Sequence, residues 1–461
     1  MPDKKLLIIG AGPGGYVAAI RGARLGFEVS LIEKDKVGGV CLNVGCIPTK
    51  ALLSATELGH DAKSASGMGV LADVKFDLEK LRAFKDSCVK KLTSGVEFLL
   101  KKNGVSLIKG EAVFTSPETI SVSGTELRFD HAIVATGSSP IEIPGFPFDG
   151  KRIITSTEAL DVSEIPERLL IIGAGVIGLE IASVYARLGS QVEIIEMMPG
   201  CLPGMDKDLT RIAEQELRKL GVKFNFSSLA SACSESARGL SVSFRCGDEP
   251  KLTEADRILV CVGRKPNSSG LGLEKAGVET DERGFIKVDE GLRTTNPKIF
   301  AIGDVIGGPL LAHKASAQGL QVVENLAGVS SGKRFRFIPG VVYTDPELAS
   351  VGATEDDLRD KGIPIRVGKF PFAANGRAVA MGKTSGFVKI IAHAETDEIL
   401  GAHMAGPHVS EMIAELALAM EAGIKAGQLG RVVHPHPTLS EAIMESAEDV
   451  HLAAVHIFRQ G

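Results

Sequence analysis

The chain has 461 residues, 44% of them hydrophobic, and a formal net charge of −5. This length suggests about three domains, each able to bury a core of its own. The mildly acidic balance, without a basic block or stripe, argues against nucleic acid as a partner. No apolar run reaches the roughly 18 residues that a membrane span requires, so we expect no membrane partner.

The first residues, MPDKKLLIIGAG, enter an apolar strand almost at once and leave no room for a signal peptide. The seven cysteines are an odd, scattered set without the spacing of a disulfide framework. Such cysteine usage is typical of a reducing, cytosolic compartment, so we expect a cytoplasmic protein. An oxidised pair in that compartment would more often be catalytic than structural.

A nucleotide-binding pattern opens the chain in LLIIGAGPGGYVAAIRGARLGFEVSLIEK. Four apolar residues lead into Gly10-x-Gly12-x-x-Gly15, a helical pattern follows, and a second strand ends at Glu33. This strand, glycine turn, helix and late acidic residue make up the dinucleotide fingerprint. The glycines let the backbone approach a pyrophosphate, and the glutamate accepts a hydrogen bond from a ribose hydroxyl.

The next segment, GVCLNVGCIPTK, places Cys41 and Cys46 five positions apart. A zinc site would need further cysteine or histidine ligands at short spacing, and none is nearby. Two buried thiols acting as small apolar groups are a second interpretation. A redox disulfide is the third: Pro48 suits the first turn of a helix, and Cys46 near that helix start would be stabilised as a thiolate.

The same nucleotide-binding pattern returns after a break near residues 143–151, in LLIIGAGVIGLEIASVYARLGSQVEIIEM. Every matching position is offset by 163, which predicts a duplicated unit and a second dinucleotide site. The matching residues are Gly173, Gly175, Gly178 and Glu196.

A shorter repeat relates FDHAIVATGSSP to ADRILVCVGRKP at an offset of 126, with Gly137 matching Gly263. Each copy is typical of a buried strand entering a glycine turn. A third strand and turn, KIFAIGDV, ends in Asp304. That carboxylate either binds a cofactor hydroxyl or initiates a turn, and the residues alone do not decide between the two.

From about residue 340 the sequence alternates like antiparallel strands, and SEMIAELALAMEAG predicts an amphipathic helix. Near the end, HPHPTLSE places His436 five residues before Glu441. Imidazole has the pKa range of a base for a thiol, and a carboxylate on its other nitrogen would fix the tautomer. A structural histidine at a strand end is the alternative, and spacing alone does not choose between His434 and His436.

Together, GVCLNVGCIPTK, the paired GAGxxG units, AIGD and HPHPTLSEA resemble the flavin disulfide reductases, also called pyridine nucleotide-disulfide reductases. The resemblance implies an α/β fold with two Rossmann-like dinucleotide-binding domains and a C-terminal α+β dimerisation domain. It implies a homodimer. The domains that it implies are 1–148 for FAD binding and the redox disulfide, 149–271 for NAD binding, 272–338 completing the FAD-binding part, and 339–461 for the interface.

The resemblance also assigns roles to matching positions. Cys46 would face the flavin as a thiolate, Cys41 would exchange with substrate, and His436 with Glu441 would act as the base, which selects His436 over His434. Lys50 and Glu180 resemble a catalytic pair near the flavin. FAD would be bound by Gly10, Gly12, Gly15, Glu33, Gly137 and Asp304. NAD would be bound by Gly175, Gly178 and Glu196. The further cofactor-binding positions are Lys50, Ala312, Gly173 and Gly263.

The implied reaction is the NAD+-dependent oxidation of dihydrolipoamide through the Cys41–Cys46 disulfide and FAD, with no metal. The implied partners are lipoyl-bearing subunits of a 2-oxoacid dehydrogenase or glycine cleavage complex, and the base would come from the second subunit. A mercuric reductase would carry a C-terminal cysteine pair, but the last cysteine is Cys261. An NADPH-dependent glutathione reductase would carry arginine near Glu196, whose charge repels a 2′-phosphate. A structural subunit of a complex would not require the cysteine and histidine motifs.

Overall fold

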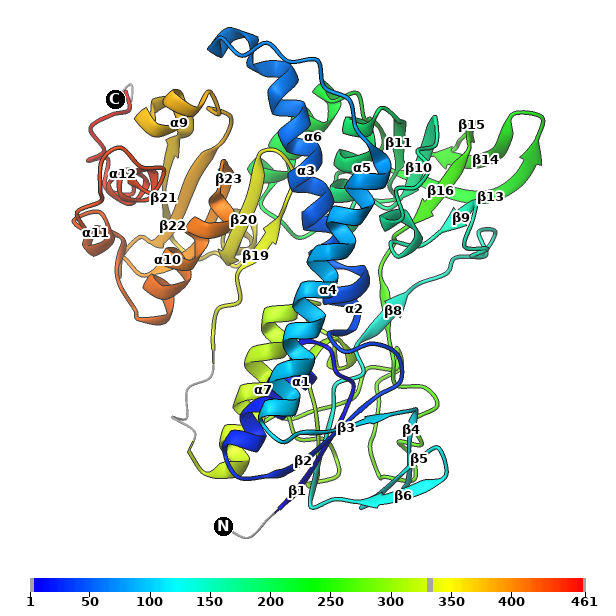
Figure 1. Cartoon of the computed structure of the whole chain (residues 1–461). Helices are drawn as coiled ribbons and strands as arrows, with labels where there is room; N and C mark the ends of the chain where they lie inside the picture. Colours follow the sequence, from blue (N-terminus) through cyan, green and yellow to red (C-terminus); the bar gives the residue numbers. More distant parts are fainter. Residues whose placement is uncertain (1–3, 330–334, 459–461) are drawn as a thin grey trace. The chain divides into compact units, whose positions relative to one another are not determined.

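The computed structural model of the chain describes residues 4–329 and 335–458. Its residues group into two compact units, each assembled from segments that are far apart in the sequence. Unit 1 comprises residues 1–55, 73–164 and 260–333, and unit 2 comprises residues 56–72, 165–259 and 334–461. Figure 1 shows the helices and strands of both units.

Unit 1 is built on a parallel sheet with the strand order β18-β7-β1-β2-β3. Its strands are β1 (Lys5–Ile9), β2 (Glu28–Glu33), β3 (Ser106–Lys109), β7 (His131–Val134) and β18 (Ile299–Ala301). The apolar run in β1 is continuous because both faces of the sheet are covered. Leu6 and Ile8 pack into one core cluster, and Leu7 and Ile9 pack into another on the opposite face.

In the described part of unit 1 the helices are α1 (Pro13–Arg24), α2 (Gly39–Val44), the first part of α3 (Cys46–Ser64), α4 (Leu78–Lys102) and α7 (Ala312–Ala327). The helix predicted around Pro48 is α3, and it begins at Cys46. The short α2, over the residues that precede it, was not predicted. The smaller strands are β4 (Ala112–Ser116), β5 (Thr119–Val122), β6 (Thr125–Arg128), β8 (Ser138–Pro140), β9 (Ile153–Ile154) and β17 (Arg264–Pro266).

Unit 2 contains the second copy of the repeated pattern. Strand β10 (Arg168–Ile172) begins 163 residues after β1, as the repeat predicted. It leads through α5 (Val176–Leu188) to the parallel strand β11 (Gln191–Ile195). The other elements of this part are α6 (Lys207–Lys219), β12 (Lys223–Asn225), β13 (Ser228–Ser236), β14 (Gly239–Cys246), β15 (Glu249–Ala255) and β16 (Arg257–Val260).

The C-terminal part of unit 2 is an antiparallel sheet with helices, as predicted. Its strand order is β19-β20-β23-β22-β21. The strands are β19 (Gly340–Val342), β20 (Glu347–Gly352), β21 (Ile365–Pro371), β22 (Phe387–His393) and β23 (Ile399–Gly406). The helices are α8 (Glu355–Asp360), α9 (Gly376–Met381), α10 (Val409–Glu421), α11 (Ala426–Leu429) and α12 (Glu441–Asp449). Among the described residues, no helix is long and apolar enough to cross a membrane.

Candidate active site

The first glycine loop joins β1 to α1 and is closed on its inner side. A Cβ atom at Gly15 would lie 1.8 Å from the carbonyl oxygen of Gly10, so only glycine fits there. A Cβ atom at Gly12 would meet no atom within 4 Å. The backbone is therefore open at the start of α1, where no side chain caps the helix. A pyrophosphate fits this helix start, because backbone N–H groups and the helix dipole attract anions.

Glu33 ties this loop to the end of β2. One carboxylate oxygen accepts a hydrogen bond from the N–H group of Ala11 at 2.7 Å, and the other accepts one from Asp35 at 2.8 Å. Each carboxylate oxygen has a second lone pair, so the carboxylate can still accept a ribose hydroxyl. The structure therefore holds Glu33 beside the loop, where the dinucleotide fingerprint requires it.

The second glycine loop, between β10 and α5, repeats this geometry. A Cβ atom at Gly175 would again meet no atom within 4 Å, and no side chain caps α5. Glu196 accepts hydrogen bonds from Ala174 at 2.6 Å and from Met198 at 2.8 Å. Both copies of the repeat therefore present an open helix start and a fixed carboxylate, and both fit a dinucleotide.

The remaining predicted glycines and Ala312 occupy turns and helices. Gly173 and Gly263 have φ values of 111° and 136°, a region that favours glycine. Gly178 is buried within α5, and Ala312 is the first residue of α7. Nothing in the geometry tests whether these residues contact a cofactor, so their cofactor-binding roles stay predictions.

Asp304 lies in a short 3₁₀ turn after β18, and its carboxylate has a protein partner. The Ser138 hydroxyl donates a hydrogen bond to Asp304 Oδ2 at 2.6 Å, and Arg264 Nε donates one to the Ser138 hydroxyl at 2.7 Å. Gly137, the residue before Ser138, has a φ of 72°. The three polar side chains thus form a chain beside the predicted glycine turn, and the second oxygen of Asp304 remains for a cofactor hydroxyl.

The sequence did not predict two cations of unit 1, the partly buried Arg264 and the buried Lys314. Burial lowers the pKa of the Arg264 guanidinium and of the Lys314 ammonium, while the charge of Asp304 opposes that effect. The sequence held no signal for Arg264, because the shorter repeat only aligns it with Ser138 and the antiparallel register places it opposite Pro140. Lys314 also had no local signal, since only its burial in α7 sets it apart.

The structure brings Cys41 and Cys46 together as two thiols. Cys41 lies in α2 and is partly buried, whereas Cys46 is exposed and is the first residue of α3. A hydrogen bond with Cys46 and burial raise the pKa of the Cys41 thiol. The positive charge of the nearby Lys50 acts to lower this pKa and offsets part of the increase. Cys46 is the better placed of the two sulfurs to be a thiolate, because it is exposed and stands at the positive end of a helix dipole.

No zinc-like cluster surrounds these cysteines within the described part of the chain. The one set of three side chains there with metal-ligating spacing is Glu57, Asp61 and Asp345, all in unit 2. The Nζ atom of Lys383 lies 2.7 Å from Glu57, 2.9 Å from Asp61 and 3.9 Å from Asp345. An ammonium group therefore already neutralises this acidic set.

His436 and Glu441 form the pair that their spacing suggested. The Nδ1 atom of His436 lies 2.8 Å from Glu441 Oε1, and Glu441 Oε2 accepts a hydrogen bond from Thr438 at 2.7 Å. Burial acts to raise the pKa of Glu441, but the hydrogen bonds from Thr438 and His436 outweigh it and hold the pKa below its usual range. The His436 side chain is 77% exposed, and among the described residues its Nε2 atom has no partner.

His434 also contacts a glutamate, but it differs from His436 in exposure and in the partner of its second ring nitrogen. Its side chain is only 5% exposed. Its Nδ1 atom lies 2.8 Å from the carbonyl oxygen of Val432, and its Nε2 atom lies 3.0 Å from Glu415. With both nitrogens engaged inside the protein, His434 has a structural role, which leaves His436 as the accessible imidazole of this motif.

Lys50 and Glu180 are placed in different units. Lys50 lies in α3, one turn after Cys46, and Glu180 is buried in α5, where its carboxylate accepts a hydrogen bond from the Tyr343 N–H at 3.0 Å. The predicted pairing of these two side chains stays a prediction.

Comparison with known proteins identifies the family. Residues 4–319 match the pyridine nucleotide-disulphide oxidoreductase family, and residues 338–447 match the dimerisation domain of the same family. A dihydrolipoyl dehydrogenase of Thermus scotoductus is 49% identical over 100% of both chains. One of Geobacillus stearothermophilus is 47% identical over 99% of this chain and 98% of its own. The chain belongs to the pyridine nucleotide-disulphide oxidoreductase family.

Solved structures agree with this assignment. LpdA of Mycobacterium tuberculosis superposes with a TM-score of 0.90 at 29% identity, covering 96% of this chain and 99% of its own. The flavoprotein disulfide reductase RclA of Escherichia coli superposes with a TM-score of 0.85 at 30% identity, covering 97% and 99%. These matches confirm the predicted fold class.

Membership of the family confirms three further predictions. The chain is an oxidoreductase, and its cofactors are FAD and NAD. The matched dimerisation domain supports the predicted homodimer. The open helix starts at Gly12 and Gly175 are each compatible with a bound dinucleotide.

Proposed function

We propose that the chain oxidises dihydrolipoyl groups to lipoyl groups and reduces NAD+ to NADH. The observation that carries the choice of substrate is the full-length likeness, at 45–49% identity, to proteins that are named dihydrolipoyl dehydrogenase. The fixed carboxylate of Glu196 supports NAD+ over NADP+, because it would repel a 2′-phosphate.

Different residues of this chain carry out the separate steps of the proposed thiol–disulfide exchange. With Glu441 ionised, Nδ1 of His436 carries its proton and donates it to the carboxylate, so Nε2 is the atom that takes a proton from the substrate thiol. The resulting thiolate attacks Cys41 Sγ in the oxidised pair, the Cys41–Cys46 bond breaks, and Cys46 leaves as a thiolate. The second substrate thiol then displaces Cys41, which releases the oxidised lipoyl group and leaves two reduced cysteines.

Bound FAD and NAD+ would supply the hydride chemistry that returns the cysteine pair to its oxidised state. For FAD we assign Gly10, Gly12, Gly15, Glu33, Gly137 and Asp304, and for NAD+ we assign Gly175, Gly178 and Glu196. We keep Lys50, Gly173, Gly263 and Ala312 as cofactor-binding residues, and the pair Lys50 and Glu180 near the flavin.

The proposed domain limits are 1–148, 149–271, 272–338 and 339–461, with FAD held by the first and third. The partners that fit this reaction are lipoyl-bearing subunits of a 2-oxoacid dehydrogenase or glycine cleavage complex. His436 would serve the cysteine pair of the second subunit of a homodimer. The scattered cysteines support a cytoplasmic location.

A substrate panel tests the proposal. The purified, FAD-loaded dimer is assayed with dihydrolipoamide and NAD+, and in parallel with glutathione disulfide and other disulfides with NADPH. We expect turnover in the first assay and little in the second. Turnover confined to NADPH and a different disulfide would contradict the proposal.

A further inference from the structure

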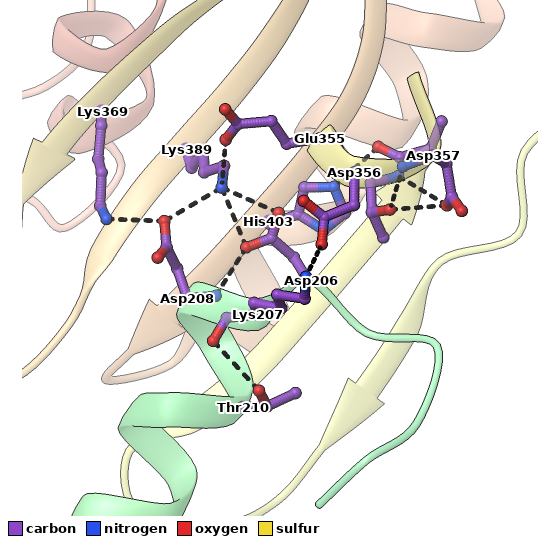
Figure 2. A network of polar contacts seen from close by, with 12 residues as sticks. Asp206, Lys207, Asp208, Thr210, Glu355, Asp356, Asp357, Lys369, Lys389 and His403 are labelled. Atoms are coloured by element: carbon purple, nitrogen blue, oxygen red, sulfur yellow. Dashed lines mark hydrogen bonds and ion pairs between the residues drawn. The ribbon is translucent and has the colours of Figure 1, made fainter. Parts of the chain in front are cut away.

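Lys389 on β22 is a buried cation enclosed by three carboxylates. Its side chain is 3% exposed, and its Nζ atom lies 2.9 Å from Asp206, 3.1 Å from Asp208 and 2.9 Å from Glu355. Figure 2 shows these groups converging from different elements. Asp206 directly precedes α6, and Asp208 lies in the first turn of that helix, in the part of the chain that follows the second glycine loop. Lys389 on β22 and Glu355 on α8 belong to the C-terminal α+β part.

The buried pair at the centre of this cluster is Lys389 with Asp206, because the Asp206 side chain is also only 3% exposed. Burial acts to lower the pKa of Lys389, but hydrogen bonds with Glu355 and Asp206 outweigh it and raise the pKa. The opposing His403 on β23 stays neutral near pH 7, because burial lowers its pKa. A lysine that remains charged in a buried site holds its carboxylates firmly, since releasing one would leave an unpaired charge in the interior.

Asp206 ends a segment that starts at Glu196, the residue assigned to the NAD+ ribose. Asp206 is the N-cap of α6 and accepts a hydrogen bond from the Asp208 N–H at 3.0 Å. Just before it, the Met205 N–H donates to the carbonyl oxygen of Leu202 at 3.1 Å. The C-terminal end of segment 196–206 is therefore fixed directly to the Lys389 cluster.

The same segment touches the second glycine loop in its middle. The Leu202 N–H donates to the carbonyl oxygen of Ala174 at 2.9 Å, and the Ala174 N–H donates to Glu196 at 2.6 Å. Cys201, beside Leu202, is 4% exposed and contacts the first turns of α6 at the carbonyl oxygen of Thr210. A displacement of Asp206 would pass through these contacts to Ala174 and Glu196.

We propose that Lys389 is a positioning residue for the NAD site: its ion pair with Asp206 fixes segment 196–206, and thereby the Glu196 carboxylate and the glycine loop at Ala174. This inference rests on the proposed assignment of the second glycine loop to NAD. The C-terminal part of the chain, which the family uses for dimerisation, would then also set nucleotide affinity.

The structure offers a matched control in Lys369 on β21. Its Nζ atom lies 3.0 Å from Asp208, one of the carboxylates that Lys389 contacts, but its side chain is 41% exposed. It has no contact with Asp206 among the described residues. Lys369→Met therefore removes a neighbouring ammonium of the same cluster without releasing the segment.

The test compares Lys389→Met and Lys369→Met as FAD-loaded proteins. The Kd of ADP-ribose is measured by calorimetry, and the KM values for NAD+ and dihydrolipoamide are measured in the steady state. We expect the Kd of ADP-ribose and the KM for NAD+ to rise by about tenfold in Lys389→Met, because small displacements of a binding group are costly. The KM for dihydrolipoamide and the rate of reduction by dihydrolipoamide should stay within about twofold of wild type, as should every value for Lys369→Met.

Two further variants test the inference even if the Lys389→Met protein does not fold. Asp206→Asn leaves Lys389 paired with Asp208 and Glu355, and we expect a rise of about threefold in the Kd of ADP-ribose. Lys389→Arg keeps the positive charge and should restore much of the affinity. An unchanged Kd of ADP-ribose in both Lys389→Met and Asp206→Asn would overturn the inference. An equal rise in the KM values for NAD+ and for dihydrolipoamide in Lys389→Met would also overturn it. Failure of the wild type to oxidise dihydrolipoamide would contradict only the proposed substrate, because the ADP-ribose comparison does not use it.

Discussion

The Nδ1 atom of His436 lies 2.8 Å from Oε1 of Glu441, and the opposite ring nitrogen of the same histidine is exposed. A carboxylate on one side of an imidazole fixes its orientation and its tautomer. In the proposed reaction the substrate proton would therefore go to Nε2 of His436, which leads to the first prediction.

His436→Gln should slow reduction of the enzyme by dihydrolipoamide by about 10²–10⁴, the usual loss for a positioned base. Reduction of the enzyme by NADH should change much less, because that step needs no substrate thiol deprotonated. Stopped-flow measurement of the two half-reactions separates these effects, and Glu441→Gln should act in the same direction more weakly. His434→Gln is the control: it should affect stability more than rate, since its ring is buried and held by Glu415. Loss of the dithiol half-reaction in the His434 variant alone would reverse the assignment.

Cys46→Ser should abolish dithiol oxidation and leave FAD bound. Cys41 lies in α2 and Cys46 begins α3, so both are outside the glycine loop that fits the dinucleotide. The flavin absorbance of the purified variant reports FAD binding, and turnover with dihydrolipoamide and NAD+ reports the redox role. Cys88→Ser, in α4, serves as the matched thiol control and should behave like wild type. Normal turnover by Cys46→Ser would show that the pair carries no electrons.

Glu196→Gln should narrow the preference for NAD+ over NADP+. The carboxylate repels a 2′-phosphate, but it also anchors Ala174 and Met198, so the variant should lose NAD+ affinity as well as gain NADP+ tolerance. The ratio of kcat/KM for the two nucleotides measures the change. Equal values in the wild-type protein would contradict the assignment of Glu196 to the ribose.

The Lys389 cluster should make the protein sensitive to acid. Burial acts to raise the pKa of Asp208 and Glu355, but hydrogen bonds from lysine and arginine side chains, Lys389 among them, hold both pKa values below their usual range. A carboxylate whose folded pKa is depressed contributes stability above its unfolded pKa of about 4, and loses that contribution as the pH falls through the folded pKa. The thermal midpoint of wild type should therefore fall more than that of Lys389→Met as the pH is lowered from ~5 to ~2, through the unfolded pKa and toward the folded one. Lys207→Met removes an exposed ion pair with Asp356 and serves as the control, so its thermal midpoint should fall with pH as much as that of wild type. Equal falls of the thermal midpoint in wild type and Lys389→Met would contradict the prediction.

The sequence predicted the elements that have local signals. The two glycine loops, with Glu33 at the end of one β-strand and Glu196 just after another, follow from a fixed spacing of glycines, apolar residues and one acid, and the structure holds both carboxylates in the same way. The alternation after residue 340 likewise predicted the antiparallel strands, because a sheet with period 2 shows its buried face in the sequence.

Long-range polar contacts had no such signal. The buried pair of Lys389 and Asp206 joins residues 183 positions apart, and nothing near either residue marks it as buried. Spacing alone likewise did not choose between His434 and His436; the resemblance selected His436, and the structure adds that the His434 side chain is buried with both ring nitrogens engaged. The short helix over Gly39–Val44 was missed because its glycines are typical of a turn.

In the proposed reaction, dihydrolipoyl groups reduce this protein through the Cys41–Cys46 pair, and NAD+ then reoxidises it. Anaerobic stopped-flow mixing of the FAD-loaded dimer with dihydrolipoamide, followed by NAD+, observes both steps. We expect a change in the flavin spectrum on the first mixing and stoichiometric NADH on the second, both absent in Cys46→Ser. An unchanged flavin spectrum with dihydrolipoamide, in a wild-type protein that NADH still reduces, would contradict this reaction.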